Sequence, residues 1–220
     1  MNILQAIKQL DIELLLCINS HHSDFFDQFM FLFSNRFVWI AFYISVIITI
    51  FVRNKKSAIW LILLLVACIV LADQISSSVI KDLVQRLRPT KEADLAPFLH
   101  IVNNYSGGLY GFVSSHAANT FGFALLSSLI FQNKLYSWSV FIWAGITSYS
   151  RIYLGVHYPS DILGGIIVGL SVASVLMLLI KKYKPQLFTA SNKTDTITER
   201  YLPTTILGIT IAGLCIYSAF

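Results

Sequence analysis

The chain has 220 residues, of which 56% are hydrophobic and 12% charged, and it carries a formal net charge of +5 at pH 7. Its mean hydropathy is +0.70. Soluble domains carry about 25% charged residues, so this composition excludes an ordinary soluble domain and predicts a polytopic membrane protein. Lipid headgroups and topology explain the positive charge better than nucleic acid, because no module of interleaved aromatic and basic residues is present. We therefore expect membrane lipids and no nucleic acid as partners.

The first 36 residues differ from the rest, because charged side chains are interspersed among Leu, Ile and Phe at amphipathic spacing. These charged residues are Lys8, Asp11, Glu13, Asp24, Asp27 and Arg36. Amphipathic helices of low net hydrophobicity lie in the membrane interface. Residues 1–36 are therefore predicted to form N-terminal interfacial helices, and residues 37–220 the transmembrane domain.

Low-charge runs in the rest of the chain predict about six transmembrane helices. A bilayer core of about 30 Å needs about 20 helical residues per crossing. The runs lie near residues 37–53, 57–80, 116–132, 135–153, 162–180 and 203–220. The expected fold class is all-α, a polytopic membrane helical bundle.

Basic clusters at the ends of spans indicate the orientation. R-N-K-K at 53–56 and K-K-Y-K at 181–184 follow the first and fifth spans directly. Because Lys and Arg concentrate in cytoplasmic connections, this side is predicted to be cytoplasmic. The connection 181–200, rich in Lys, Thr and Ser, is expected to be a flexible cytoplasmic linker.

A polar stripe interrupts the second span. Asp73, Ser77 and Lys81 recur every four residues, and Arg88 follows. A charged group at mid-membrane costs on the order of 3 kcal/mol, so this stripe is expected to line the bundle interior or an aqueous mouth. Pro89 disfavours helix at the preceding residue, so Arg88 is expected to end the span. The alternative for Lys81 and Arg88 is a helix end that extends two cations to the headgroups.

A polar loop, residues 90–113, leads from the second span into Ser114, Ser115 and His116. The loop is too long for a simple connection and is expected to be a lid or binding element. Serine is a good N-cap, and the free N–H groups of a helix start favour anions. We therefore predict an anion site beside His116, the alternative being serine caps followed by an incidental histidine. The other histidines, His21, His22 and His100, are expected to be solvated surface residues.

A third polar cluster, S-Y-S-R-I-Y-L-G-V-H-Y-P-S-D, occupies residues 148–161. Residues 158–160 form a turn that ends one helix and opens the next, so Asp161 can bend back onto His157. A carboxylate on one ring nitrogen fixes the tautomer and leaves the other nitrogen free to attack an electrophile. Arg151 would hold an anion beside it. The alternative is a helix end that carries a chance salt bridge.

Together the three clusters resemble the type 2 phosphatidic acid phosphatase (PAP2) superfamily, which shares its site with vanadium haloperoxidases. The first, K-x6-R-P at 81–89, and the third, S-R-x5-H-x3-D at 150–161, match in full. The second departs, because the family's Pro-Ser-Gly-His appears as Val-Ser-Ser-His at 113–116. This change affects the backbone contact that the family makes at the glycine. The resemblance implies a six-helix bundle and a bacterial membrane lipid phosphatase.

The resemblance also implies a role for each motif residue. His157 would attack phosphorus to form a phosphohistidine, Asp161 would stabilise the imidazolium, and His116 would protonate the leaving oxygen and then activate water. The implied phosphate-binding residues are Lys81, Arg88, Ser114, Ser115 and Arg151. A phosphomonoester carries nearly two negative charges, which these cations and helix-start amides complement. No metal and no cofactor is expected.

The predicted orientation places the site outside the cytoplasm, on the periplasmic side of a bacterial inner membrane. A substrate that reaches such a site from within the bilayer is expected to be a lipid phosphate. Undecaprenyl diphosphate or a lipid A phosphate is favoured, and phosphatidate and phosphatidylglycerol phosphate are the alternatives. The sequence makes no prediction of the oligomeric state.

Other activities fit the residues less well. A serine hydrolase using Ser114 or Ser115 would have no use for three convergent cations. A metal hydrolase ligated by His116, His157 and Asp161 would place a divalent ion beside cations that repel it. A lipid-phosphate binding or transport protein would not need the two histidines and Asp161. A haloperoxidase acts on a soluble halide, to which a bundle embedded in lipid is poorly suited.

Overall fold

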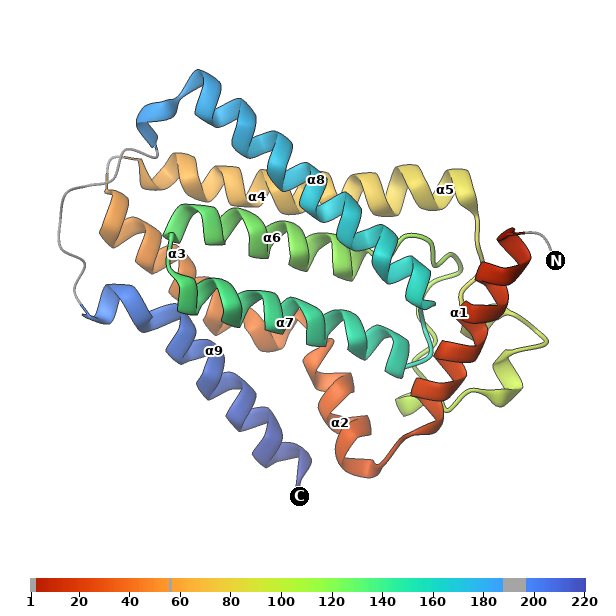
Figure 1. The fold of residues 1–220 in the computed structure, drawn as a ribbon. Helices are drawn as coiled ribbons and strands as arrows, with labels where there is room; N and C mark the ends of the chain where they lie inside the picture. Colours follow the sequence, from red (N-terminus) through yellow and green to blue (C-terminus); the bar gives the residue numbers. More distant parts are fainter. Residues whose placement is uncertain (1–2, 56, 188–196) are drawn as a thin grey trace.

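A computed structural model describes residues 3–55, 57–187 and 197–220. These residues form helices and connections, with an isolated antiparallel bridge between Leu87 and Tyr110 (Figure 1). The helices are α1 Ile3–Ser20, α2 Asp24–Phe33, α3 Ile40–Asn54, α4 Ala58–Gln74, α5 Lys81–Val84, α6 Ser115–Phe131, α7 Lys134–Tyr153, α8 Pro159–Tyr183 and α9 Ile197–Ser218. The all-α prediction is confirmed. Residues 188–196, in the middle of the expected flexible linker, lie outside the described residues.

The helix α6 lies at the centre of the bundle. It packs against α4, α7 and α8, whereas α3 packs against α4 and α9 (Figure 1). Buried residues of α6 include Ala117, Ala118, Phe123, Ala124 and Leu126, which do not share a single face. A helix that buries most of its circumference belongs in the core of a bundle. Its first turn carries Ser115 and His116, so the central helix also presents motif residues.

Four segments are long and apolar enough to cross a membrane, judged by length and composition: Arg36–Asn54, Ala58–Val84, Pro159–Tyr183 and Tyr201–Ser218. They coincide with four of the expected spans. The helices α6 and α7 have 17 and 20 residues and lie alongside them, where two further spans are expected (Figure 1). Ile44, Leu63 and Leu178 expose large apolar side chains on the outer helices. This arrangement agrees with a bundle of about six transmembrane helices.

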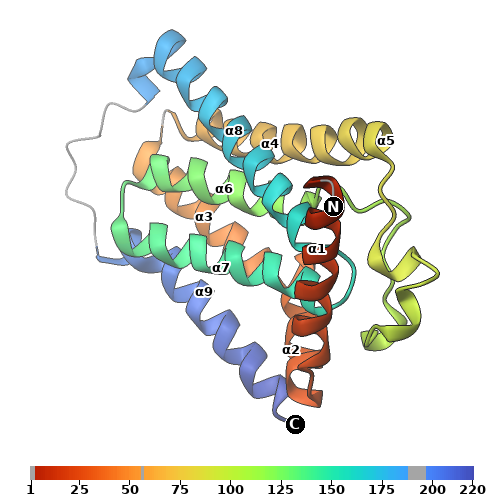
Figure 2. The ribbon, with the colours of Figure 1, turned by 45° about the vertical axis from the view of Figure 1, so that its right-hand side comes forward.

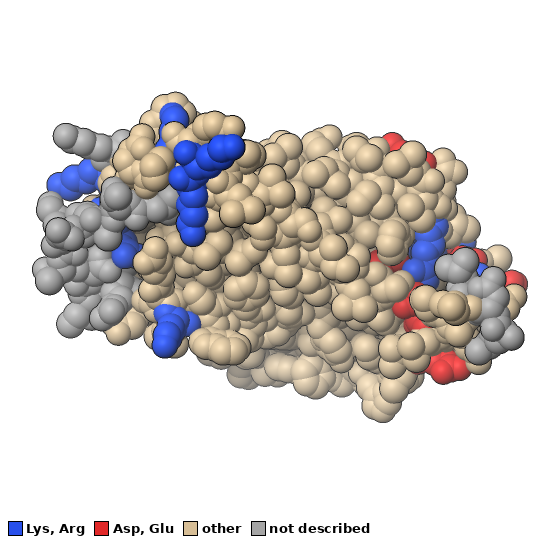
Figure 3. Space-filling view, turned by 45° about the horizontal axis from the view of Figure 1, so that its top comes forward, with Lys and Arg blue, Asp and Glu red and all other residues tan. Residues whose placement is uncertain are grey.

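Charged side chains gather at the two ends of the bundle. In Figure 3, Lys and Arg gather at one end, Asp and Glu lie at the other together with some Lys or Arg, and the visible surface between the two ends is uncharged. Arg53 and Lys55 lie at the end of α3 and Lys181, Lys182 and Lys184 at the end of α8, and these two helix ends lie at the same end of the bundle (Figure 1). An uncharged belt between two charged ends is the surface that a transmembrane bundle requires.

Two glycines of α8 bring this helix against the start of α6. A Cβ at Gly165 would overlap the carbonyl oxygen of Ser114, and one at Gly169 would overlap that of Ala118. No side chain fits at either position without a backbone shift. The close contact therefore places the helix that follows His157 beside the helix start that carries His116.

The second span ends earlier than predicted. The helix α5 ends at Val84, and Gln85 adopts a left-handed conformation with φ 50°. Arg88 lies beyond the helix, and its backbone N–H donates to the carbonyl of Leu109 at 3.0 Å. The expectation that Arg88 ends the helix is thus wrong, because the chain leaves the helix at Gln85 and continues as an extended segment beside the 90–113 loop.

A π-helical segment, Ile75–Ile80, joins α4 to α5 and changes the phase of the polar stripe. Such a segment bonds residue i to i+5 instead of i+4. As a result Ser76 is fully buried, whereas Ser77 is only partly buried. Asp73 and Lys81 still face the interior, as the stripe predicts.

The helix α1 crosses the end of the bundle at α7 and α8 (Figure 2). Asp11, Leu15 and Asn19 follow one another at intervals of four residues, and all three are buried. The amide of Asn19 donates to the carbonyls of His100 and Tyr153 at 2.9 and 2.7 Å. The N-terminal segment therefore forms part of the wall around the end of the bundle where the motifs lie.

Candidate active site

His157 and Asp161 lie together at the junction of α7 and α8, and both are 0% exposed. Gly155, with φ +70°, turns the chain after α7, and Pro159 opens α8. Asp161 accepts a hydrogen bond from the backbone N–H of Tyr158 at 3.0 Å, which fixes the carboxylate at the helix start. His157 Nδ1 lies 3.2 Å from Asp161 Oδ2, so we assign the proton to Nδ1. Nε2 is buried without a hydrogen-bond partner among the described residues, which leaves its lone pair available.

Three cations, two from the first motif and one from the third, act on this imidazole. Lys81, Arg88 and Arg151 are 9%, 8% and 2% exposed. Burial lowers the pKa of His157 well below the ordinary value, and the positive charges of Arg88, Arg151 and Lys81 lower it further. The structure therefore brings together the three cations that the sequence analysis assigned to one anion site.

Arg88 is held by the loop that follows it. Its Nε donates to the carbonyl of Tyr110 at 3.1 Å, and its Nη1 donates to that of Val156 at 3.3 Å. Gly107, with φ +66°, lies so close that a Cβ there would be 2.7 Å from Arg88 Nη1. The 90–113 loop thus packs directly on a phosphate-binding candidate, as expected for a binding element.

Arg151 is held from two other directions. Its Nη2 donates to the hydroxyl of Tyr105 at 2.7 Å, and its Nη1 donates to the hydroxyl of Ser34. Its Nε is buried without a partner among the described residues. A buried guanidinium donor costs free energy unless it is paired, so this atom is suited to an incoming anion.

The second motif connects the other two. Ser114 is the N-cap of α6: its hydroxyl accepts from Ala117 N, and its own N–H donates to the carbonyl of Asp161 at 2.9 Å. Ser115, at the family's glycine position, accepts a hydrogen bond from Lys81 Nζ at 3.0 Å. The serine in place of glycine therefore orients a cation. The backbone donor of Ser114 is engaged within the protein, and its contact with phosphate stays a prediction.

His116 lies on the first turn of α6 and lines two cavities. One, of about 290 Å³, also contains Arg151 and Tyr105. The other, of about 440 Å³, contains Asp73 and Asn119. His116 is thus shared by two neighbouring cavities, each of which also contains a phosphate-binding candidate, Arg151 in the smaller and Ser115 in the larger.

Arg86 and Asp11 complete the site, and the sequence analysis did not single them out. Arg86 Nη1 donates to Asp161 Oδ1 at 3.1 Å, and Nη2 donates to Asp11 Oδ2 at 2.8 Å. The guanidinium lies 3.9 Å from the ring centroid of Tyr158. Asp11 also accepts from the backbone N–H of Ser160 at 2.9 Å. Asp161 is therefore held through both carboxylate oxygens, and α1 supports the arrangement.

His100 is not the free surface histidine that was expected. Its Nε2 lies 2.6 Å from Asp27 Oδ2, and its ring stacks on His22 with centroids 3.7 Å apart. These contacts attach the 90–113 loop to the start of α2. His22, Asp27 and His100 present possible metal-ligand atoms within 4.8 Å of one another, and this group is distinct from the motif residues. His21 and His22 are exposed, as predicted.

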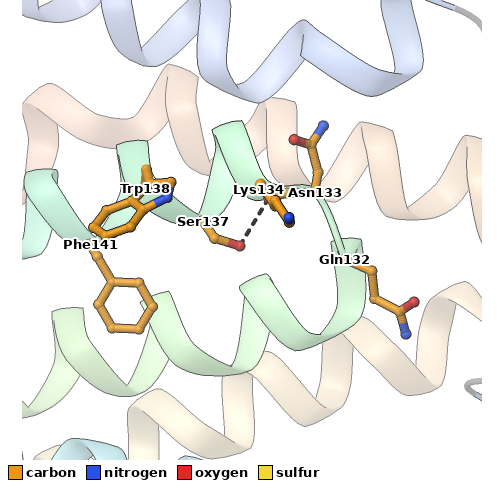
Figure 4. A pocket seen from close by; sticks show the side chains of 6 residues that line it. All are labelled: Gln132, Asn133, Lys134, Ser137, Trp138 and Phe141. Carbon is orange, nitrogen blue, oxygen red and sulfur yellow. Dashed lines mark hydrogen bonds between the residues drawn. The ribbon is translucent and has the colours of Figure 1, made fainter.

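A further pocket of about 460 Å³ lies where α6 turns into α7, lined by Gln132, Asn133, Lys134, Ser137, Trp138 and Phe141 (Figure 4). Because α6 has 17 residues, this pocket lies about 25 Å along the helix from His116. It contains none of the motif residues and has no part in the site.

The chain matches the model of the PAP2 superfamily over residues 61–185. This chain belongs to the PAP2 superfamily. It is 38% identical over 169 residues to the lipid A 4'-phosphatase of Bacteroides thetaiotaomicron, covering 76% of this chain and 75% of that protein. It is 34% identical over 170 residues to the lipid A 4'-phosphatase of Porphyromonas gingivalis, covering 77% and 72%.

A more distant relative of this PAP2 phosphatase is the undecaprenyl-diphosphatase of Sulfolobus acidocaldarius, 29% identical over 142 residues, covering 64% of this chain and 63% of that protein. No solved structure gave a significant match to the chain. The family match contains all three motifs, so the resemblance stated from them is confirmed. The protein is a membrane lipid phosphatase of this superfamily.

Proposed function

We propose that this PAP2 phosphatase removes the phosphate of a membrane lipid through a phosphohistidine intermediate, with a lipid A phosphate as the first candidate substrate. The observation that carries the proposal is the state of His157: Nδ1 faces Asp161 at 3.2 Å, and Nε2 is buried among cations without a partner in the described part of the chain. Two relatives that share about three quarters of their length with this chain are lipid A 4'-phosphatases. Undecaprenyl diphosphate is the second candidate, because another relative is named as an undecaprenyl-diphosphatase.

This geometry supports the following first chemical step. The lone pair on His157 Nε2 attacks phosphorus while the bond from phosphorus to the lipid oxygen breaks. Asp161 stabilises the imidazolium that forms, since it already faces Nδ1–H. His116 donates a proton to the lipid oxygen, which leaves as an alcohol.

The second step hydrolyses the intermediate. His116, now neutral, takes a proton from a water molecule, and the water oxygen attacks the phosphohistidine. The bond from phosphorus to Nε2 breaks, inorganic phosphate leaves and His157 regains its lone pair. Lys81, Arg88 and Arg151 stabilise negative charge on phosphorus in both steps.

The three cations also support a reaction without metal. They supply positive charge around the phosphoryl group, and they would repel a divalent ion at the same place. Phosphate release in a strong chelator is therefore expected to equal that in its absence. A loss of activity that added divalent metal restores would contradict this part of the proposal.

We place the active site on the periplasmic face of a bacterial inner membrane. The support is the basic end of the bundle, opposite the motif residues, which the positive-inside rule assigns to the cytoplasm (Figure 3). On α1, Ile3, Ile7, Leu10 and Leu14 expose apolar side chains at intervals of three or four residues. This stripe supports an interfacial position for residues 1–36 beside a phosphatase domain at 37–220.

Purified protein in detergent, given each candidate lipid phosphate, tests the function. His157→Ala is expected to abolish phosphate release. His116→Ala is expected to lower turnover on the order of 10² to 10⁴, the usual worth of a general acid. The native protein should form an acid-labile, base-stable phosphoenzyme that His157→Ala lacks. Turnover by His157→Ala at the native rate would refute the nucleophile.

A further inference from the structure

The cavity of about 440 Å³ beside His116 has the composition of a sugar-binding site. It lies between α3, α4, α6 and α7, and its wall includes Trp39, Tyr43, Asp73, His116, Asn119 and Trp143. Its volume falls within the range of small-molecule sites, about 300 to 1,000 Å³. Aromatic rings and short polar side chains line it together, which suits a ligand with both C–H faces and hydroxyl groups.

The cavity adjoins the phosphate site on the side of His116. Ser115, which accepts from Lys81 Nζ, lines it next to His116. In the proposed mechanism His116 protonates the leaving oxygen, so the group that departs lies on the side of this imidazole. The cavity is therefore where the alcohol of the substrate would be held.

Polar atoms in the wall are available for such an alcohol. Asn119 Nδ2 donates to Asp73 Oδ1 at 2.9 Å, which fixes the carboxylate and the amide side by side. Asn119 Oδ1 and Trp143 Nε1 are buried without hydrogen-bond partners among the described residues. An unpaired buried polar group costs free energy, so a ligand that bonds to it is favoured. A ligand that reached these atoms would find acceptors for hydroxyl or amide N–H groups and a donor for an oxygen.

The same wall disfavours a charged leaving group. A lipid diphosphate would leave a second phosphate in this cavity, next to the carboxylate of Asp73, and like charges repel. Lys81 Nζ reaches the same wall at Ser115 and offsets part of this repulsion. Arg36 also lines the cavity, but its side chain is exposed, so solvent screens its charge more effectively. The neutral hydroxyls of a sugar meet no such repulsion.

We propose that this cavity is a subsite for the sugar that carries the phosphate, with Asp73 and Asn119 as specificity-determining residues that select a glycolipid phosphomonoester over a lipid diphosphate. The inference rests on the proposed function, since it assigns the leaving group by the role of His116. It goes further by naming the residues that distinguish the two candidate substrates.

The test compares native protein with Asp73→Asn and Asn119→Ala. The ratio of kcat/KM for a lipid A phosphate to kcat/KM for undecaprenyl diphosphate is expected to fall at least about tenfold in Asp73→Asn, because the change removes a charged acceptor from the sugar and a repulsive charge from the diphosphate. Asp82→Asn is the matched control, because Asp82 is exposed further along the same helical segment; its ratio should equal the native one.

A second measurement does not depend on turnover. The dephosphorylated glycolipid is the product that would occupy the subsite, and its inhibition constant should rise about tenfold in both Asp73→Asn and Asn119→Ala. Native ratios and native inhibition constants in both folded variants would overturn the subsite and leave the phosphatase intact. Failure of the native protein to release phosphate from any lipid would instead overturn the proposed function.

Discussion

Asp161 faces His157 across 3.2 Å with one carboxylate oxygen and Arg86 across 3.1 Å with the other. The carboxylate therefore connects the imidazole to a cation that is itself paired with Asp11. Such a connection fixes both the tautomer and the direction of the ring. The proposed nucleophile is thus positioned by charge as well as by packing.

Asp161→Asn is expected to keep the shape of this junction and lose its charge. An amide can present N–H to Nδ1 and so favour the wrong tautomer, and it no longer stabilises the imidazolium. Turnover should fall on the order of 10² to 10⁴. Formation of the phosphoenzyme, followed by rapid quench, should slow by the same factor, and an unchanged rate of this step would show that the carboxylate does not act on His157.

Arg86→Gln should lower kcat about 10- to 100-fold, as loss of an outer partner of a catalytic group commonly does, with little change in KM. Its guanidinium contacts the carboxylate of Asp161, so it acts as a positioning residue. Asp11→Asn should act in the same direction and more weakly, because it removes only the charge that holds Arg86. Lys8→Gln is the control, because it removes an exposed charge from α1, the helix that carries Asp11. If Asp11→Asn changed kcat no more than Lys8→Gln does, the contact of α1 with Arg86 would contribute nothing specific.

Gly169→Ala is expected to destabilise the protein by about 1 to 3 kcal/mol, the usual cost of overpacking. Its new methyl group would overlap the carbonyl oxygen of Ala118 and meet Gly122 N at 2.9 Å, and backbone atoms cannot rotate away. Gly145→Ala is the matched control, because a Cβ there meets nothing within 4 Å; it should be neutral or stabilising by up to about 1 kcal/mol. Thermal unfolding in detergent measures both, and equal midpoints would contradict the close packing of α6 and α8.

The titration of His157 provides a test of its surroundings. Its pKa is lowered, by burial first and then by Arg88 and Arg151, so the folded protein keeps the ring neutral at pH values where a free histidine is half protonated. The unfolded chain binds this proton at higher pH than the folded one. The contribution of the neutral His157 ring to the free energy of unfolding is therefore full above the pKa of the ring in the unfolded chain. It is lost as pH falls from that pKa to the lower pKa of the folded protein.

Nitrogen NMR of labelled histidine in the detergent-solubilised protein measures this pKa, with His157→Ala identifying the signal. We expect a midpoint below that of an ordinary histidine and a neutral form protonated on Nδ1. A midpoint at or above the ordinary value would mean that the three cations lie too far away to act on the ring.

Local patterns in the sequence were enough to predict the helical fold and most residues of the candidate site. A charged residue within an apolar run is costly in a membrane, so the clusters at 81–89 and 148–161 are conspicuous. Their resemblance to the family motifs, together with 113–116, assigned all three to one site. The turn between His157 and Asp161 is local, and their contact was predicted from a spacing of four residues. The helical fold followed equally from the length and apolar composition of the runs.

Only the tertiary structure decided which residues meet from distant parts of the chain. Arg86 lies 75 residues from Asp11 in the sequence, and Ser160 lies 149 residues from it, and no local periodicity encodes such contacts. The left-handed turn at Gln85 and the π-helical segment Ile75–Ile80 displaced Arg88 and Ser77 from their predicted places, because packing overrides the regular helix there. Sequence determined which chemistry the chain carries, since charge and spacing are local; packing decided its geometry, since a site is formed by contacts between segments that only folding brings together.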